Sequence, residues 1–263
     1  MGFKMINVQL KSNEELEIMR RANIVVAEVH ALLREAASPG VTTAELDRIA
    51  RRHLDKRGAK SAFLGYHGFP AVLCTSVNEK VVHGIPSDKE PLRDGDICSI
   101  DFGAIVDGYV GDAAQTLAIG KVSERAAKLL EVTRGALGAA IEQCRPGRRL
   151  RDVCGAVEEH VTPHGFGVVR DFVGHGIGRK MHEDPQVPNY RVGGRLGALR
   201  LEPGLVIAIE PMINEGTFET KTLDDGWTVV TADGKLSAHF EHSVAITRNG
   251  PWVLSDPEAI DPR

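Results

Sequence analysis

The chain has 263 residues, a formal net charge of −4, 42% apolar residues and 26% charged residues. This balance is typical of a globular protein with a sizeable core, and the small net charge does not favour a bulk nucleic-acid binder. No apolar run is long enough to span a bilayer, and the first residues lack the apolar stretch of a signal peptide. The four cysteines form no CxxC pair, so we expect a reduced, cytoplasmic protein.

Local signals along the first half of the chain predict two helices followed by a hairpin. Capping boxes at Ser12 and Thr42 begin the helices, which should end before Pro39 and at Gly58. The dipeptide Asp107-Gly108 is a strong signal for a two-residue hairpin turn. Extended segments are predicted at residues 69–77, 81–85, 97–106 and 109–119.

The second half repeats this order in coarse form. Helices are predicted at residues 124–144 and 149–162, and strands at residues 167–174, 205–213, 227–232 and 239–247. The pattern is that of a mixed α/β chain, and we expect residues 1–263 to form a single domain.

Asp101 and Asp112 lie on the two strands of the predicted hairpin. If Asp107-Gly108 is the turn, Asp101 pairs with Ala114, and Asp112 becomes its diagonal neighbour on the same sheet face. Two carboxylates on one face of an otherwise apolar hairpin repel each other unless a cation lies between them. The alternative is a polar sheet face exposed to water.

Two histidines lie in a glycine-rich segment, His175 in GHGIG and His182 in HEDP. The segment matches neither the dinucleotide motif GxGxxG nor the zinc-protease motif HExxH. A single histidine is more often structural than a metal ligand, and two of them change that expectation only modestly.

Two glutamates occur within apolar strands. Glu210 ends the run LVIAI and is either buried with a partner or turned to solvent. Glu241 begins another such strand, on which His242 should point to the opposite face and be structural. His239 shares a face with Glu241, and its role stays open.

Taken together and in this order, these residues resemble the type I methionine aminopeptidases, which have the pita-bread fold. The resemblance extends from the first helix to about residue 255, through the segments LGYHGFP, CTSVNEKVVHGIP, IDFGAIVDGYVGDAAQT, GHGIGRKMHEDP, IEPM and DGWTV. It implies a curved antiparallel sheet covered by helices in a pseudo-two-fold arrangement. The implied activity is removal of the initiator methionine before a small second residue by a hydroxide bridged between two metal ions.

The resemblance also implies the ligands of two divalent ions, which are Asp101, Asp112, His175, Glu210 and Glu241. Their four negative charges match two dications. The set is rich in oxygen and has no thiolate, which favours Mn, Fe or Co, with Zn as the remaining candidate.

By the same resemblance, Glu210 is the proton shuttle, and His83 and His182 contact the substrate. The methionine pocket would be lined by Tyr66, His67, Phe69, Cys74, Met181 and Trp227. The chain departs from the family pattern at Phe63, where cysteine is frequent, at Phe69, where tyrosine is frequent, and at Met181, where phenylalanine is frequent. A monovalent cation, Na or K, is expected near Asn78, Ser237 and the carbonyl of Lys80. The expected partners are nascent polypeptides and, transiently, the ribosome, and the expected oligomeric state is a monomer.

The nearest alternative is an Xaa-Pro aminopeptidase or prolidase of the same fold. Those enzymes usually carry an extra N-terminal domain, whereas only 100 residues precede Asp101. Type II methionine aminopeptidases have a helical insertion before the last ligand, but 30 residues separate Glu210 from Glu241. A non-catalytic relative is disfavoured because all five ligand positions carry ligating side chains. A serine hydrolase is disfavoured because GxSxG does not occur.

Overall fold

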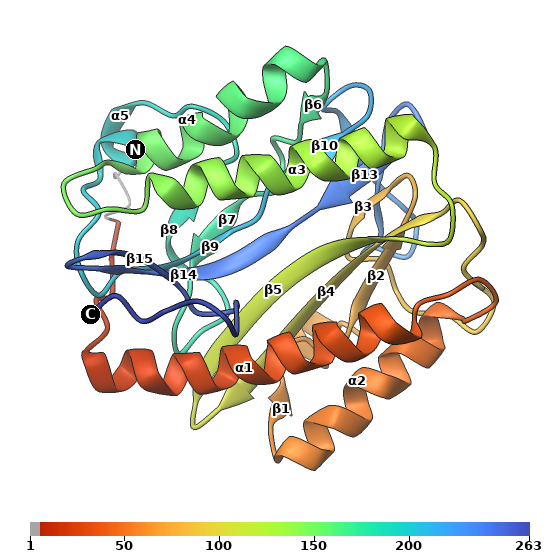
Figure 1. The fold of residues 1–263 in the computed structure, drawn as a ribbon, viewed down its shortest axis with the longest axis horizontal. Coiled ribbons are helices and arrows are strands. Elements are labelled where there is room, and N and C mark those ends of the chain that lie inside the picture. The colour runs from red at the N-terminus through yellow and green to blue at the C-terminus, as the bar shows by residue number, and fades with distance from the viewer. Residues whose placement is uncertain (1–5) are drawn as a thin grey trace.

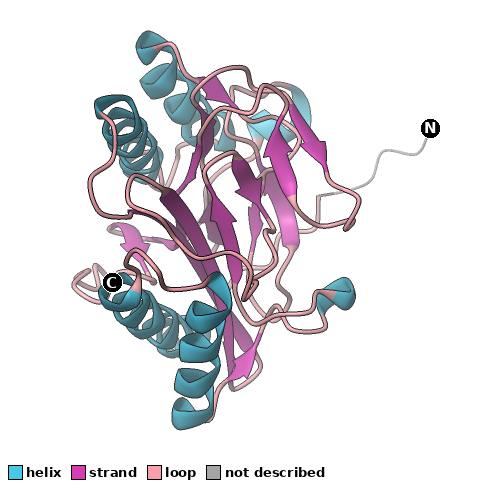
Figure 2. Cartoon of the chain, turned by 90° about the vertical axis from the view of Figure 1, so that its right-hand side faces the viewer, coloured by secondary structure: helices cyan, strands magenta, loops and turns pink. Residues whose placement is uncertain are grey.

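The computed structural model describes residues 6–263 as helices packed against a curved sheet (Figure 1). The long helices come in two pairs, α1 (Asn13–Ala36) with α2 (Thr43–Arg57), and α3 (Glu124–Glu142) with α4 (Leu150–Val161). Both pairs lie on the same side of the sheet (Figure 2). The short helix α5 (Gly194–Ala198) and the 3₁₀ turns η1 (Tyr66–Gly68) and η2 (Thr162–His164) complete the helical elements of the described chain.

The main sheet has nine strands, and its pairs are antiparallel. Its path is β1 (Lys60–Ser61), β4 (Ile97–Val106), β5 (Tyr109–Ala118), β14 (Glu241–Thr247), β9 (Val206–Ile209), β7 (Gly174–Gly176) and β8 (Glu183–Val187). Off this path, β2 (Cys74–Val77) pairs with β4, and β15 (Gly250–Val253) pairs with β14.

Two three-stranded sheets flank the main one. The first is formed by β13 (Ser237–His239), β10 (Met212–Asn214) and β6 (Gly167–Val168), and the second by β11 (Thr220–Thr222), β12 (Val229–Thr231) and β3 (Lys80–Val82). A curved antiparallel sheet covered by helices is the architecture that the resemblance implies.

Each helix pair covers its own half of the sheet with its own apolar core. Side chains of α1 and α2 pack with Ile100 and Phe102 of β4, whereas side chains of α3 and α4 pack with Ile207 of β9 and Val244 of β14. The halves meet where β5 pairs with β14. The two-fold repetition predicted from the order of elements is therefore present in the packing.

The local sequence signals predicted most of these helices and strands correctly. Ser12 and Thr42 cap α1 and α2 with complete capping boxes, and Gly58 ends α2 in the left-handed conformation at φ 61°. The hairpin register pairs Asp101 with Ala114, as predicted from the turn. The extended segment predicted at 69–77 was too long, since β2 covers only its last four residues. The sequence analysis did not predict the short strands β1, β8, β11 and β15, because these segments lack the alternation of apolar and polar residues that indicates a strand.

The crossing of α1 over β5 requires a glycine at position 111. A Cβ atom on Gly111 would lie 2.6 Å from the backbone nitrogen of Asn23 in α1, which is closer than real contacts allow. Because both groups are fixed by regular secondary structure, neither can move aside easily.

We therefore expect Gly111→Ala to lower the free energy of unfolding by about 1–3 kcal/mol, the usual cost of overpacking. Gly138→Ala is the matched control, because this exposed residue of α3 has open space around it. It should stabilise the protein by about 1 kcal/mol through helix propensity. Urea denaturation with an unchanged m-value measures both effects. Equal effects of the two substitutions would contradict the close approach at Gly111.

Candidate active site

The two aspartates lie on the sheet face opposite the helices. On β4, Ile100 and Phe102 enter the core under α1 and α2, so Asp101 between them must point to the other face. Asp112 of β5 pairs with Gly103 and is 3% exposed. The alternation of the strands thus directs both carboxylates to one buried side, and the solvent-exposed alternative is wrong for Asp112.

Three further ligand-type residues reach this face from the second half of the sheet. Glu241 begins β14 and pairs with Ala114, the same residue that pairs with Asp101 on the other side. His175 on β7 pairs with Ala208 of β9, and Glu210 directly follows β9. The side chains therefore converge from strands that are far apart in sequence but adjacent in the sheet.

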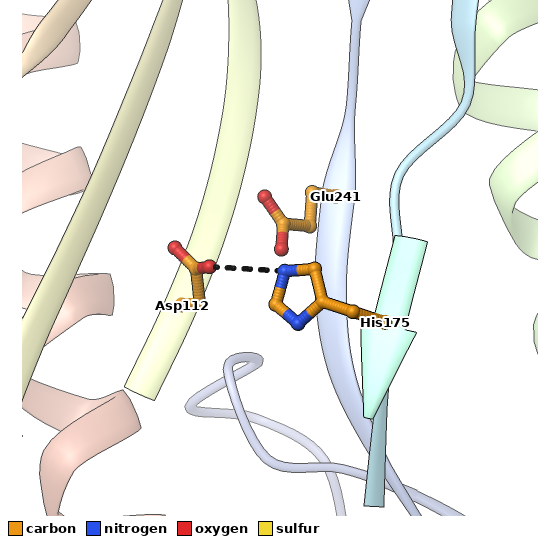
Figure 3. A group of neighbouring side chains, drawn as sticks. All are labelled: Asp112, His175 and Glu241. Carbon is orange, nitrogen blue, oxygen red and sulfur yellow. Dashed lines mark ion pairs between the residues drawn. The ribbon is translucent and has the colours of Figure 1, made fainter. Parts of the chain in front are cut away.

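The centre of the cluster is tight. Ligand atoms of Asp112, His175 and Glu241 all lie within 4.8 Å of one another, and the three side chains point toward a common space (Figure 3). His175 Nε2 lies 3.9 Å from Asp112 Oδ2 and 3.5 Å from Glu210 Oε1. His175 Nδ1 lies 2.9 Å from the carbonyl oxygen of Gly176, to which it donates. The Nε2 lone pair is therefore free to face the carboxylates, as in many metal-binding histidines.

Burial makes the ionised form of these carboxyl groups unfavourable unless a positive charge lies close to them. Burial raises the pKa of Asp101 to about 7. Burial and then the neighbouring carboxylates raise the pKa of Asp112, Glu210 and Glu241 well above their usual range. Burial lowers the pKa of His175 to about 3, so this imidazole is neutral and cannot supply a positive charge.

The donor set fits divalent cations. Asp101 Oδ1, Asp112 Oδ1 and Glu241 Oε1 are buried and have no hydrogen-bond partner among the described residues. Buried polar atoms are normally paired, so three unpaired carboxylate oxygens on one face indicate a missing cation partner. Carboxylate oxygens with one imidazole are ligands for metals such as Mn, Fe, Co or Zn.

A cavity of about 240 Å³ adjoins the cluster. One side is formed by the five proposed ligands, and the remainder is mainly apolar and aromatic. Its walls include Phe63, Tyr66, His67, Phe69, Cys74, His83, Met181, His182 and Trp227. The rings of Phe69 and Trp227 meet edge to face at 5.1 Å. An apolar chamber that ends at a charged cluster suits a substrate with an apolar side chain next to the reacting group.

His83 and His182 complete the polar side of the cavity. His83 has a positive φ of 59°, an uncommon conformation for a residue with a side chain, and its ring meets those of Phe172 and Trp227. Burial lowers its pKa to about 4. The His182 ring lies edge to face with His175 at 4.4 Å, and burial also lowers the pKa of His182. Both imidazoles are therefore neutral near pH 7.

Comparison with known proteins agrees with this geometry. The model of metallopeptidase family M24 matches residues 17–248. A methionine aminopeptidase from Clostridium acetobutylicum is 52% identical over 94% of this chain and 98% of its own length. Methionine aminopeptidase 1 from Bacillus subtilis is 50% identical over 93% of this chain and 98% of its own length. The chain belongs to the methionine aminopeptidases of metallopeptidase family M24.

Solved structures distinguish this family from its neighbours of the same fold. The methionine aminopeptidase from Thermotoga maritima superposes with a TM-score of 0.92 at 42% identity, and the match covers 95% of this chain and 99% of that one. A prolidase from Pyrococcus furiosus has a TM-score of 0.75 at 24% identity, and the match covers 66% of its length. The prolidase shares the fold, whereas the methionine aminopeptidases share fold, sequence and length, so the prolidase alternative is disfavoured.

The structure brings every residue of the predicted site to one cavity, although their individual roles stay predictions. Phe63 also lines the cavity, and the sequence marked it only as a departure from the family pattern. His239, left open from the sequence, is buried with Nε2 4.0 Å from Glu210 Oε2. His242 is directed away, as predicted, and its Nδ1 lies 2.8 Å from Ser255 Oγ.

Two of the residues expected near a monovalent cation, Asn78 and Ser237, lie together. The Ser237 backbone nitrogen donates to the Asn78 carbonyl oxygen at 2.9 Å. The Asn78 side chain accepts from the Ile97 nitrogen at 3.1 Å and donates to Asp96 Oδ1 at 2.8 Å. These bonds order the segment, and the cation itself stays a prediction.

Binding of a divalent cation to this methionine aminopeptidase should release protons. After chelation, the cluster carboxyls with raised pKa values hold protons near pH 6, and an incoming cation must displace them. Calorimetry with Mn²⁺ in two buffers of different ionisation enthalpy measures the number released. That number should fall as the pH rises through the pKa of Asp101, about 7, because Asp101 is then already ionised.

Glu131→Gln is the control for proton release, since Glu131 is an exposed residue of α3 far from the cluster in the fold. This substitution should leave the number of protons released on Mn²⁺ binding unchanged. Tight binding of Mn²⁺ at pH 6 with no proton release would show that the cluster is not the binding site.

Proposed function

We propose that this protein hydrolyses the peptide bond that follows an N-terminal methionine, in polypeptides whose second residue is small. The observation that carries the proposal is the cavity itself, in which a mainly aromatic chamber ends at a neutral histidine and four carboxyl groups, of which Asp112 and Glu241 are buried. Sulfur packs favourably against aromatic rings, so an unbranched thioether side chain suits this chamber. The family relationship supports the same substrate.

Two divalent ions would be held by Asp101, Asp112, His175, Glu210 and Glu241. By the resemblance, Asp112 and Glu241 would serve both ions, Asp101 one of them, and His175 with Glu210 the other. When bound, such ions lower the pKa of water and stabilise developing negative charge on a peptide carbonyl oxygen. Mn, Fe and Co suit this oxygen-rich set best.

Glu210 is the proposed proton carrier. Its carboxyl group lines the cavity, its Oε1 lies 3.5 Å from His175 Nε2, and burial raises its pKa well above the ordinary range. A carboxyl group of raised pKa can accept a proton from the attacking water and return it to the leaving amine. Glu210 immediately follows β9, so its backbone position is fixed by the sheet.

His83 and His182 are the proposed substrate contacts. As neutral imidazoles, they can donate a hydrogen bond to the peptide group without adding a charge to the site. A donor aimed at the carbonyl oxygen stabilises the negative charge that develops there. The apolar walls hold the methionine side chain and so fix the scissile bond against these donors.

Location and partners stay predictions from the sequence. Among residues 6–263, no helix is long and apolar enough to cross a membrane. We propose a cytoplasmic monomer that meets nascent chains, with a transient ribosome contact.

The substrate is tested with chelated protein that is reloaded with Mn²⁺ or Co²⁺ and offered two peptide series. We expect release of free methionine from Met-Gly and Met-Ala peptides, and at least a hundredfold lower kcat/KM for X-Pro peptides, since a site that lacks the matching contacts loses transition-state binding. Mass spectrometry of the products identifies the bond that is cut. Faster cleavage of the X-Pro series would replace this proposal with a prolidase activity.

Glu210→Gln should keep the fold and lower kcat by about 10²–10⁴-fold, because the amide cannot carry the proton. Metal content must be measured on the same sample, since Glu210 is also a proposed ligand. Glu215→Gln is the matched control, as Glu215 lies outside the cavity and pairs with Arg125. A metal-loaded Glu210→Gln variant with full activity would refute the proton-transfer role.

A further inference from the structure

Tyr66 and His182 form a hydrogen bond with each other in the wall of the cavity. The Tyr66 hydroxyl oxygen lies 2.7 Å from His182 Nδ1, and the two ring centroids are 5.5 Å apart. Tyr66 begins the 3₁₀ turn η1, whereas His182 immediately precedes β8, so the bond joins segments that are remote in sequence. Both residues line the cavity.

The tyrosine is the donor in this hydrogen bond. A neutral imidazole carries one proton, and its other ring nitrogen accepts a hydrogen bond. Burial raises the pKa of Tyr66, so the phenol also keeps its proton. A phenol is a stronger acid than a neutral imidazole N–H, and the favoured pair is O–H···Nδ1. The imidazole proton is then left on Nε2.

The loop that carries Tyr66 is built to hold this side chain in place. The Tyr66 nitrogen donates to the Phe63 carbonyl at 2.9 Å, and the Phe69 nitrogen donates to the Tyr66 carbonyl at 2.9 Å. Ser61 Oγ accepts from the nitrogens of Phe63 and Leu64 at 3.1 and 2.9 Å. A side chain on such a supported turn can fix the orientation of a neighbour.

No second hydroxyl from this turn can replace that of Tyr66. His67 and Phe69 also line the cavity from this segment, and neither carries a hydroxyl. The His67 ring meets the Tyr66 ring edge to face at 4.4 Å, and the Phe69 ring packs on Trp227. The His182 ring also meets the His175 ring edge to face at 4.4 Å, a contact that does not distinguish its two nitrogens.

We propose that Tyr66 is a positioning residue, whose hydroxyl holds His182 in one orientation and in the tautomer that carries its proton on Nε2. This inference rests on the proposed function, in which His182 donates to the substrate. An imidazole without the Tyr66 bond could turn over or move its proton to Nδ1, and the donor would then be absent from Nε2 for part of the time. The Tyr66 hydroxyl acts through His182. This effect is separate from any packing of the Tyr66 ring on the methionine side chain.

The kinetic test uses Tyr66→Phe, which removes only the hydroxyl. We expect kcat to fall by about tenfold, the usual effect of one hydrogen bond, while KM for a Met-Ala peptide changes less than twofold. Tyr190→Phe is the matched control, because Tyr190 stacks with Arg170 outside the cavity and should not affect either constant. A higher KM with unchanged kcat would show that Tyr66 only lines the pocket.

A double-mutant cycle tests whether the effect passes through His182. In the His182→Ala background, Tyr66→Phe should change kcat less than twofold, because the group that it positions is gone. A full tenfold additional loss would overturn the proposal.

A measurement without turnover separates this inference from the proposed function. In metal-free protein at pH 7.5, the ¹⁵N shifts of His182, assigned by their loss in His182→Ala, should show the Nε2–H tautomer, and Tyr66→Phe should show a mixture. An Nδ1–H tautomer in the unsubstituted protein would overturn the inference whatever the substrate. The expected tautomers together with no cleavage of methionyl peptides would instead refute the proposed function.

Discussion

Repulsion between buried carboxylates is the interaction on which this site depends. Asp112 and Glu241 carry their acid groups onto the same desolvated face, with Asp101 and Glu210 beside them. Among the described residues, the ion pairs of these carboxylates involve only histidines, and burial keeps the nearest of them, His175, neutral. The cluster thus carries acidic groups that no neighbouring positive charge compensates, which agrees with a metallopeptidase family. Metal binding and the ionisation of the cluster are therefore one coupled equilibrium.

The curved sheet explains how these groups can be held together against their repulsion. The proposed ligands Asp101 and Asp112 belong to the half covered by α1 and α2, and His175, Glu210 and Glu241 to the half covered by α3 and α4. The halves are joined in the sheet by β5 and β14, through the pairs Glu241 with Ala114 and His242 with Ala113. The apolar cores behind the sheet stabilise each half separately and so offset the cost of the charged face. A cation bound at the junction would hold both halves through ligands from each.

The aromatic walls of the cavity affect the protonation and hydrogen bonding of the groups inside it. Burial against these walls lowers the pKa of His83 to about 4 and keeps its ring neutral near pH 7. A hydrogen bond made in a buried site of low dielectric is stronger than the same bond in water. The hydroxyl of Tyr66 is one of the few polar atoms that the walls contribute, and it is bonded to His182. The few polar atoms of this chamber are thus available to orient neighbouring groups, while its apolar atoms surround the space next to the cluster.

The sequence by itself determined the local structure and, through its motifs, the family. Capping boxes at Ser12 and Thr42 and the turn at Asp107-Gly108 act within a few residues, so they predicted helix starts and the hairpin register correctly. Short strands such as β8 escaped prediction because pairing with β7, rather than their own composition, makes them extended.

Only the tertiary structure decided which side chains meet and which of them lose water. Glu210 could have faced solvent, and the role of His239 was open, until the sheet placed both at the buried cluster. The contact between Tyr66 and His182 spans 116 positions of the chain, and no periodicity or motif encodes such a distance. Burial and long-range contact depend on the packing of the whole chain, whereas caps and turns depend on neighbouring residues alone.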